Sequence, residues 1–198
     1  MDVADRIRRS FRELGERTAI EFRGRWISWR EVGRFADRLD TLLAAAGVAP
    51  GARIGLVARN RASHAAAMLA LVAARRSISL VHPFLPAAAL SAEIERLGAA
   101  ALIADAEDWP PIAASCARIG CAGIALAEEP FLPAPVDGLE CAIIAGAADD
   151  GVIEILSSGT TGPPKRLPLP LHVLQRAVDS APEGEGADGP RRRSTSGR

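Results

Sequence analysis

The sequence predicts an α/β fold: a partial, doubly wound and mainly parallel sheet with flanking helices, followed by a disordered tail. Short β-branched runs alternate with Ala- and Leu-rich segments that have helical spacing. The 198 residues are 48% hydrophobic, with a mean hydropathy of +0.12, which suffices for one buried core. Residues 181–198 contain no Val, Ile, Leu, Met, Cys or aromatic residue, so they cannot bury enough surface to become ordered. We therefore expect one domain over residues 1–180 and a disordered tail over residues 181–198.

A β-hairpin and a capped helix are expected first. Residues 19–22 and 26–28 are apolar, strand-like runs on either side of a turn that contains glycine. Ser28 is followed three residues later by Glu31, which is the spacing of a capping box at a helix start. Apolar residues at helical spacing then continue to Gly47, a typical helix stop. The sequence predicts a hairpin that leads directly into a long amphipathic helix.

The middle of the chain alternates strand-like and helical segments. Strands are predicted over 54–58, 77–81 and 101–104, and helices over 62–74 and 87–97. This order of elements predicts parallel strands joined by right-handed crossovers, with helices on both faces of the sheet.

Further elements are expected toward the end of the domain. The apolar runs 121–126 and 141–145 are candidates for additional strands, separated by a proline-rich loop over residues 130–135. Residues 152–156 read as another strand, and a short helix is expected over residues 171–178.

Charge and hydropathy exclude several classes of protein. Lys and Arg number 24 and Asp and Glu number 24, and this balance lacks the excess of positive charge typical of general nucleic-acid or anionic-membrane binders. The longest nearly apolar run, residues 65–74, is half as long as a membrane span requires. The first residues contain no apolar signal-peptide core. We expect a cytoplasmic protein with no nucleic-acid partner and no membrane partner.

The cysteines do not predict a metal site. Cys116, Cys121 and Cys141 contain no C-x-x-C spacing, and an odd number of cysteines is a poor disulfide framework. We expect reduced, structural thiols and no bound metal.

The histidines and one acidic stretch are also expected to be structural. His64, His82 and His172 are scattered along the chain and share no spacing with a metal ligand or a catalytic partner. We expect them on helix surfaces or in loops. The acidic residues within 105–108 are expected to form a solvated loop.

One segment has a composition that points to chemistry. Directly after the strand predicted at 152–156, four hydroxyl side chains and two glycines lie within six residues, and Lys165, the only lysine of the chain, follows. Exposed N–H groups of a glycine-containing turn, neutral hydroxyl donors and an ammonium group together suit a polyphosphate. The candidate phosphate-binding residues are Ser157, Ser158, Gly159, Thr160, Thr161, Gly162 and Lys165. We call residues 157–165 the phosphate segment.

Other phosphate-binding motifs do not fit this segment. A Walker A loop needs four residues between its glycines and a lysine directly after the second, whereas only two residues separate Gly159 from Gly162 and Lys165 follows Pro164. The G-x-G-x-x-G pattern of kinases and dinucleotide-binding folds is absent. A surface turn without a ligand is the remaining alternative.

The phosphate segment closely resembles the motif S/T-S-G-S/T-T-G-x-P-K-G of the AMP-dependent synthetase/ligase family. This adenylate-forming family includes acyl-CoA synthetases, nonribosomal-peptide adenylation domains and luciferases. Residues 25–32 and 47–54 also resemble the family's patterns at its first hairpin and at the turn into a strand. The likeness runs from about Thr18 to about Val178, and the chain is thus similar to the N-terminal portion of the family.

The resemblance implies a ligase that activates a carboxylic acid with ATP. In the family, the carboxylate attacks the α-phosphate, pyrophosphate leaves, and the acyl-adenylate is typically converted to a thioester, often of coenzyme A. The resemblance further implies that the phosphate segment holds the β- and γ-phosphates, with Lys165 as the residue that positions them, and that Mg²⁺ accompanies the ATP.

Two departures from the family pattern are visible. Arg166 stands where the motif has glycine, so its side chain either clashes with the backbone or adds a cation to the phosphate site. The family's adenine- and acid-binding segments, metal ligand and mobile C-terminal domain correspond to positions beyond Val178. We expect the 198-residue chain alone to bind ATP weakly and to be catalytically incomplete.

Three alternatives stay open at this point. In the first alternative, the chain is a truncated, non-enzymatic relative of the family, or half of a split enzyme that pairs with a complementing chain. In the second alternative, the chain is a small phosphate-binding protein or phosphotransferase that reuses the phosphate segment. In the third alternative, the tail after Val178 results from an interrupted reading frame.

Overall fold

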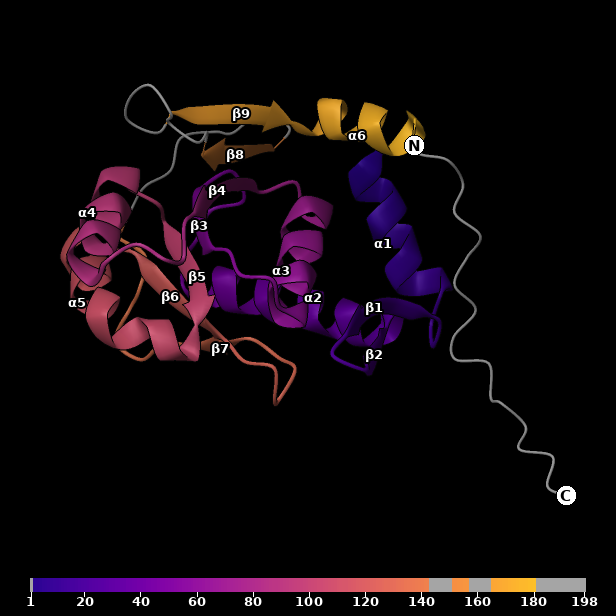
Figure 1. Ribbon diagram of the computed structural model, residues 1–198, viewed down its shortest axis with the longest axis horizontal. Coiled ribbons are helices and arrows are strands. Elements are labelled where there is room, and N and C mark those ends of the chain that lie inside the picture. The colour runs from indigo at the N-terminus through magenta and orange to yellow at the C-terminus, as the bar shows by residue number, and fades with distance from the viewer. Residues whose placement is uncertain (1, 143–150, 157–164, 181–198) are drawn as a thin grey trace, which may run out of the picture.

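The computed structural model describes residues 2–142, 151–156 and 165–180, in which a seven-stranded sheet is covered by helices on both faces (Figure 1). The strand order is β7-β6-β5-β3-β4-β8-β9. Neighbours among β6, β5, β3, β4 and β8 pair in parallel, whereas β7 and β9 pair antiparallel at the two edges. The strand bounds are β3 Arg53–Val57, β4 Ser77–Val81, β5 Ala101–Asp105, β6 Ala122–Leu126, β7 Ala134–Pro135, β8 Val152–Leu156 and β9 Arg166–Pro170.

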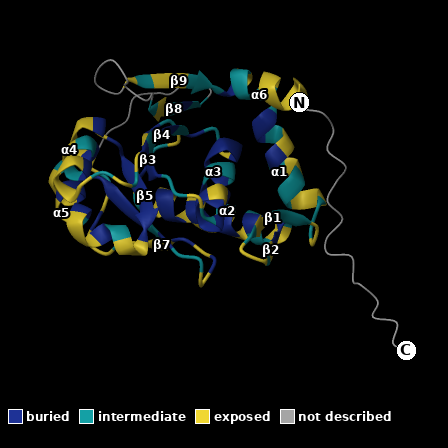
Figure 2. Cartoon of the chain, viewed as in Figure 1, coloured by how far each residue is buried: buried dark blue, intermediate teal, exposed yellow. Residues whose placement is uncertain are grey.

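The helices form two layers on opposite faces of the sheet. One layer contains α1 (Val3–Glu13), α2 (Trp29–Ala45), α3 (Ala62–Ala73) and α6 (Leu171–Ser180), and the other contains α4 (Ala87–Leu97) and α5 (Trp109–Ile119) (Figure 1). A short 3-10 turn, η1 (Ala106–Asp108), precedes α5. The central strands are buried, and exposed residues concentrate on the outer faces of the helices (Figure 2). The doubly wound, mainly parallel arrangement predicted from the alternation of elements is confirmed.

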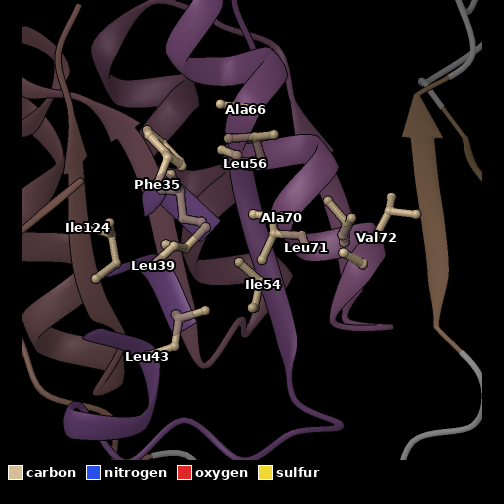
Figure 3. Packing of buried hydrophobic residues seen from close by; sticks show 14 of the residues in the cluster. Phe35, Leu39, Leu43, Ile54, Leu56, Ala66, Ala70, Leu71, Val72 and Ile124 are labelled. Carbon is tan, nitrogen blue, oxygen red and sulfur yellow. The ribbon is translucent and has the colours of Figure 1, made fainter. Parts of the chain in front are cut away.

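The larger core lies between α2, α3 and the sheet. Phe35, Leu39 and Leu43 follow one another at helical spacing on α2 and meet Ile54 and Leu56 of β3 (Figure 3). All five side chains are at most 1% exposed. Burial of each such side chain stabilises the fold by roughly 1.5–3 kcal/mol, so this contact anchors α2 to the sheet.

The predicted hairpin and capping box are confirmed. β1 (Thr18–Phe22) and β2 (Arg25–Ser28) form a separate two-stranded sheet that leads into α2. The Glu31 N–H donates to Ser28 Oγ at 3.2 Å, and the Ser28 N–H donates to Glu31 Oε2 at 2.8 Å. These reciprocal bonds satisfy two N–H groups that the helix itself leaves without partners.

Three elements were not predicted from the sequence, and each has a physical reason to form. α1 is rich in arginine, and its helix start depends on the Asp2 carboxylate, which accepts the Asp5 N–H at 2.9 Å. α5 begins with prolines, which are tolerated in the first helical turn. β9 contains Pro168 and Pro170, which an edge strand accommodates because only one of its sides must donate hydrogen bonds.

Two loop and strand predictions need correction. Residues 130–135 were expected to be a loop throughout, but Ala134 and Pro135 form β7 and pair with Ala125 and Ile124. An edge strand of two residues needs few donors, so the prolines do not prevent it. In the run 141–145, residues 141 and 142 are not in a strand, and 143–145 lie outside the described residues. The predicted disordered tail, residues 181–198, also lies outside them.

Candidate functional site at the carboxyl edge of the sheet

The carboxyl ends of the parallel strands meet at one edge of the sheet. β3 pairs with β4 and β5, and β4 pairs with β8, all in parallel, so the segments that follow these strands lie at the same edge. The segment after β3 leads to α3 on one face, whereas those after β4 and β5 lead to helices on the other. Ligands of open α/β sheets bind at such reversals, outside the carboxyl ends of the strands.

The two residues that flank the phosphate segment are paired at this edge. Leu156, the last residue of β8, is directly paired with Arg166, the first residue of β9. Lys165 is exposed and immediately precedes β9. The remaining predicted phosphate-binding residues lie outside the described residues; these are Ser157, Ser158, Gly159, Thr160, Thr161 and Gly162.

Arg166 resolves a question that the sequence left open. Its backbone belongs to β9, and its φ is not positive. Its side chain is 18% exposed, forms an ion pair with Glu93 of α4, and donates to the Leu80 carbonyl oxygen of β4 at 3.3 Å. The guanidinium is therefore held against α4 and β4, and the glycine of the family motif is replaced here without backbone strain.

A buried ionic network occupies the adjacent ends of β3 and β5. Arg59, two residues after β3, lies 3.0 Å through Nε from Asp105 Oδ2 and 2.5 Å through Nη2 from Asp108 Oδ1. Arg61 Nη1 lies 3.1 Å from the same Asp105 oxygen. The hydrogen bond to Asp108 and the nearby carboxylates raise the pKa of Arg59. Asp105 is 1% exposed, so the prediction of a solvated acidic loop is wrong at this residue.

His64 belongs to this network and not to a helix surface. It is 3% exposed; its Nδ1 accepts the Arg59 N–H at 3.2 Å, and its Nε2 lies 3.0 Å from Asp105 Oδ1. Because Nδ1 accepts, the neutral ring carries its proton on Nε2 and donates it to Asp105. No local pattern in the sequence signals this pair, because the partners are 41 residues apart.

A large exposed aromatic side chain follows β4 at the same edge. Phe84 is 77% exposed, and the Arg59 guanidinium carbon lies 5.6 Å from the centre of its ring. His82 Nδ1 accepts the Phe84 N–H at 3.2 Å, which orients the segment between β4 and α4. As predicted, His82 is in a loop.

The described part of the chain contains neither a metal-binding cluster nor a membrane span. Within residues 2–142, 151–156 and 165–180, no three His, Cys, Asp or Glu side chains gather as a metal site would require. Cys116, Cys121 and Cys141 form no disulfide bond within the described residues. Over the same ranges, every helix is too short or too polar to cross a bilayer.

The chain matches the family model of the AMP-binding enzymes over residues 7–188. A medium/long-chain-fatty-acid–CoA ligase of Mycobacterium tuberculosis is 31% identical over 169 residues, which are 83% of this chain and 28% of that protein. The chain thus spans somewhat more than a quarter of the curated relative.

Solved structures of related ligases share the fold. The ATP-bound structure of MatB from Rhodopseudomonas palustris is 25% identical, with a TM-score of 0.66 over 86% of this chain and 35% of that one. A benzoate CoA ligase from Burkholderia xenovorans is 20% identical, with a TM-score of 0.67 over 90% of this chain and 36% of that one. The edge geometry, the family model and these relatives agree: the chain belongs to the AMP-binding enzyme family, of whose members it matches an N-terminal portion.

Proposed function

We propose that this chain provides the ATP-phosphate-binding part of an AMP-forming ligase that activates a carboxylic acid. The observation that carries the proposal is the junction of β8 and β9, where Leu156 and Arg166 pair and the phosphate segment connects them at the carboxyl edge of a parallel sheet. The ATP-bound relative from Rhodopseudomonas palustris supports ATP as the ligand.

The residues of the segment suit a triphosphate. The proposed donors are the hydroxyls of Ser157, Ser158, Thr160 and Thr161, the N–H groups at the two glycines, and the ammonium of Lys165. Donors of this kind position the β- and γ-phosphates and stabilise the charge of departing pyrophosphate without any covalent step on the protein. Lys165 is thus proposed to position the phosphates.

We further propose that Mg²⁺ accompanies the ATP and that its ligands lie outside this chain. In the complete enzyme, the acid would attack the α-phosphate, and the acyl-adenylate would then react with an acceptor such as coenzyme A. The proposed partners are therefore ATP, a small carboxylic acid and the segments that complete the site. Cysteines that form no disulfide bond within the described residues support a reducing, cytoplasmic setting.

Completion of the site would require further polypeptide, on the same chain or on a complementing one. An apolar strip on the β8–β9 ribbon supports this proposal. Ile153 and Leu169 form one cross-strand pair on this strip and pack into the core, whereas Ile155 and Leu167, the next pair on the same face, are 38% and 48% exposed. Exposed apolar surface continuous with a core is typical of a protein interface.

The outer edge of β9 limits how such a polypeptide can bind. Prolines have no N–H, so the pairs of β8 and β9 that exchange hydrogen bonds are those of Leu167 and Leu169. The outward-facing donor positions of β9 are then Arg166, Pro168 and Pro170, and of these only Arg166 has an N–H group to donate to another strand. We propose that the completing segments cover the apolar face of the ribbon and do not extend the sheet.

Calorimetric titration of the chain with MgATP tests the phosphate segment. Lys165→Met is expected to weaken MgATP binding by at least about tenfold, because a charge-assisted hydrogen bond to phosphate is lost. Arg17→Met removes an exposed cation next to β1 and serves as the matched control, with affinity within about twofold of the wild type. Equal affinities for the wild type and Lys165→Met would refute the proposed role of Lys165.

A further inference from the structure

A basic groove lies between α1 and α2, away from the carboxyl edge of the sheet. It has a volume of about 360 Å³, which is within the range of small-molecule sites. In Figure 1, α1 and the start of β9 lie on opposite sides of the molecule, so the groove is separate from the β8–β9 junction. The groove is lined by Arg8, Phe11, Arg12, Arg30, Gly33, Arg34 and Asp37.

The lining thus contains four arginines and one carboxylate, that of Asp37. Arg8 pairs with Asp5 at 2.5 Å and donates to the Ala73 carbonyl oxygen at 2.6 Å, and Arg30 pairs with Glu16 at 2.9 Å. These two side chains are therefore held in place by groups outside the groove lining. Arg12 and Arg34 are exposed, and no carboxylate of the described residues forms an ion pair with either of them. Their charge is available to a ligand.

Several residues of the groove would destabilise α1 and α2 as isolated helices. Arg8 and Arg12 on α1, and Arg30 and Arg34 on α2, are like charges four residues apart, a spacing that destabilises a helix. Gly33 lies inside α2, where alanine would favour the helix. Residues whose local preferences disfavour the observed structure are expected to cluster at functional sites.

Gly33 lies where α1 and α2 contact each other. A Cβ atom at position 33 would lie 3.4 Å from the Phe11 Cβ, which is ordinary van der Waals contact, so packing alone does not require glycine there. Phe11 packs at 6.1 Å from the Trp29 ring and provides an apolar wall. The packing of α1 against α2 thus places the arginines of both helices along the same groove.

We propose that this groove binds a small phosphorylated anion with at least two phosphate charges, independently of the phosphate segment. Planar guanidinium groups match phosphate oxygens in bidentate geometry, and Arg12 and Arg34, which form no ion pair within the described residues, can each bind one phosphate group. The proposal does not depend on the proposed ATP site.

Inorganic pyrophosphate is the probe, added to the ¹⁵N-labelled 198-residue chain and followed by amide chemical shifts. We expect shifts at Arg12, Gly33 and Arg34, and we expect the double variant Arg12→Gln/Arg34→Gln to bind at least about tenfold more weakly. Arg38→Gln is the matched control, because Arg38 is exposed on α2 but does not line the groove. Its affinity is expected to stay within about twofold of the wild type.

Two further readouts distinguish binding in the groove from binding elsewhere on the chain and from a purely structural role of the arginines. Lys165→Met should leave the shifts at α1 and α2 unchanged, whatever happens to ATP binding. The double variant should be at least as resistant to urea as the wild type, because like-charge repulsion is relieved, and a merely structural role would lower its stability. Absence of pyrophosphate binding, shifts confined to residues beside β8 and β9, or unchanged affinity in the double variant would each overturn the proposal.

Discussion

At the scale of single residues, the network of His64, Asp105 and Arg59 shows what a sequence conceals. Asp105 lies in an acidic run that resembles solvated loops, and His64 lies in an Ala-rich helix, so neither residue alone indicates burial. Their contact requires β3 and β5 to be neighbours in the sheet, which is a consequence of the tertiary fold. By contrast, the Ser28–Glu31 pair is local and could be predicted from spacing.

Asp105→Asn tests the structural importance of this network. The substitution keeps the shape of the side chain but removes the charge that faces Arg59, Arg61 and His64. We expect a loss of about 2–3 kcal/mol in the free energy of unfolding, less than for a fully buried pair because both arginines are partly exposed. Urea denaturation measures this loss, and Asp137→Asn in the exposed turn after β7 is the control. A change below about 0.5 kcal/mol would show that the network adds little to stability.

At the scale of elements, helices and strands could be predicted where the sequence has regular apolar spacing or a clear stop residue. The inner strands of the sheet and α2, α3 and α4 have clear apolar spacing or clear stop signals, such as Gly98 with a φ of +58° at the end of α4. α5 also ends with such a stop signal, Gly120 with a φ of +66°, but prolines interrupt the pattern at its start, as they do in β9, and arginines obscure the apolar spacing of α1. These elements are fixed by packing against the sheet and its helices.

Ser28→Ala tests how much the predicted capping box contributes to α2. Loss of the Ser28 hydroxyl leaves the Glu31 N–H without its acceptor at the helix start. We expect the free energy of unfolding to fall by about 1 kcal/mol, measured by chemical denaturation. Ser28→Thr, which retains the hydroxyl, should recover most of this loss; equal stability of the two variants would contradict the capping role.

At the scale of the whole molecule, the candidate site is only partly predictable. The hydroxyl- and glycine-rich composition of the phosphate segment and the single lysine indicated a phosphate site, and the strand before it is confirmed as β8. The pairing of Leu156 with Arg166 and the contact of Arg166 with Glu93 could not be predicted, because β9 carried no strand signal. The groove between α1 and α2 requires two helices to meet and was likewise not visible in the sequence.

The exposed apolar strip leads to a prediction for the isolated chain. Ile155 and Leu167 of the strip are 38% and 48% exposed, Val178 of α6 is 40% exposed, and we expect self-association through these three side chains. Leu167→Lys/Val178→Lys should lower the weight-average mass in sedimentation equilibrium toward that of one chain. Trp26→Lys removes a 44% exposed aromatic on β2 and should leave the mass unchanged. A wild-type chain that is monomeric at all concentrations would argue against an interface on this face.

The phosphate segment, which connects β8 and β9, is proposed to bind the phosphates of a nucleotide. The sharpest test is the ratio of dissociation constants for AMP and MgATP, measured in the Arg12→Gln/Arg34→Gln variant so that the groove does not contribute. If the segment holds the β- and γ-phosphates, MgATP binds at least about tenfold more tightly than AMP. Equal affinity for the two nucleotides would show that the segment does not hold these phosphates.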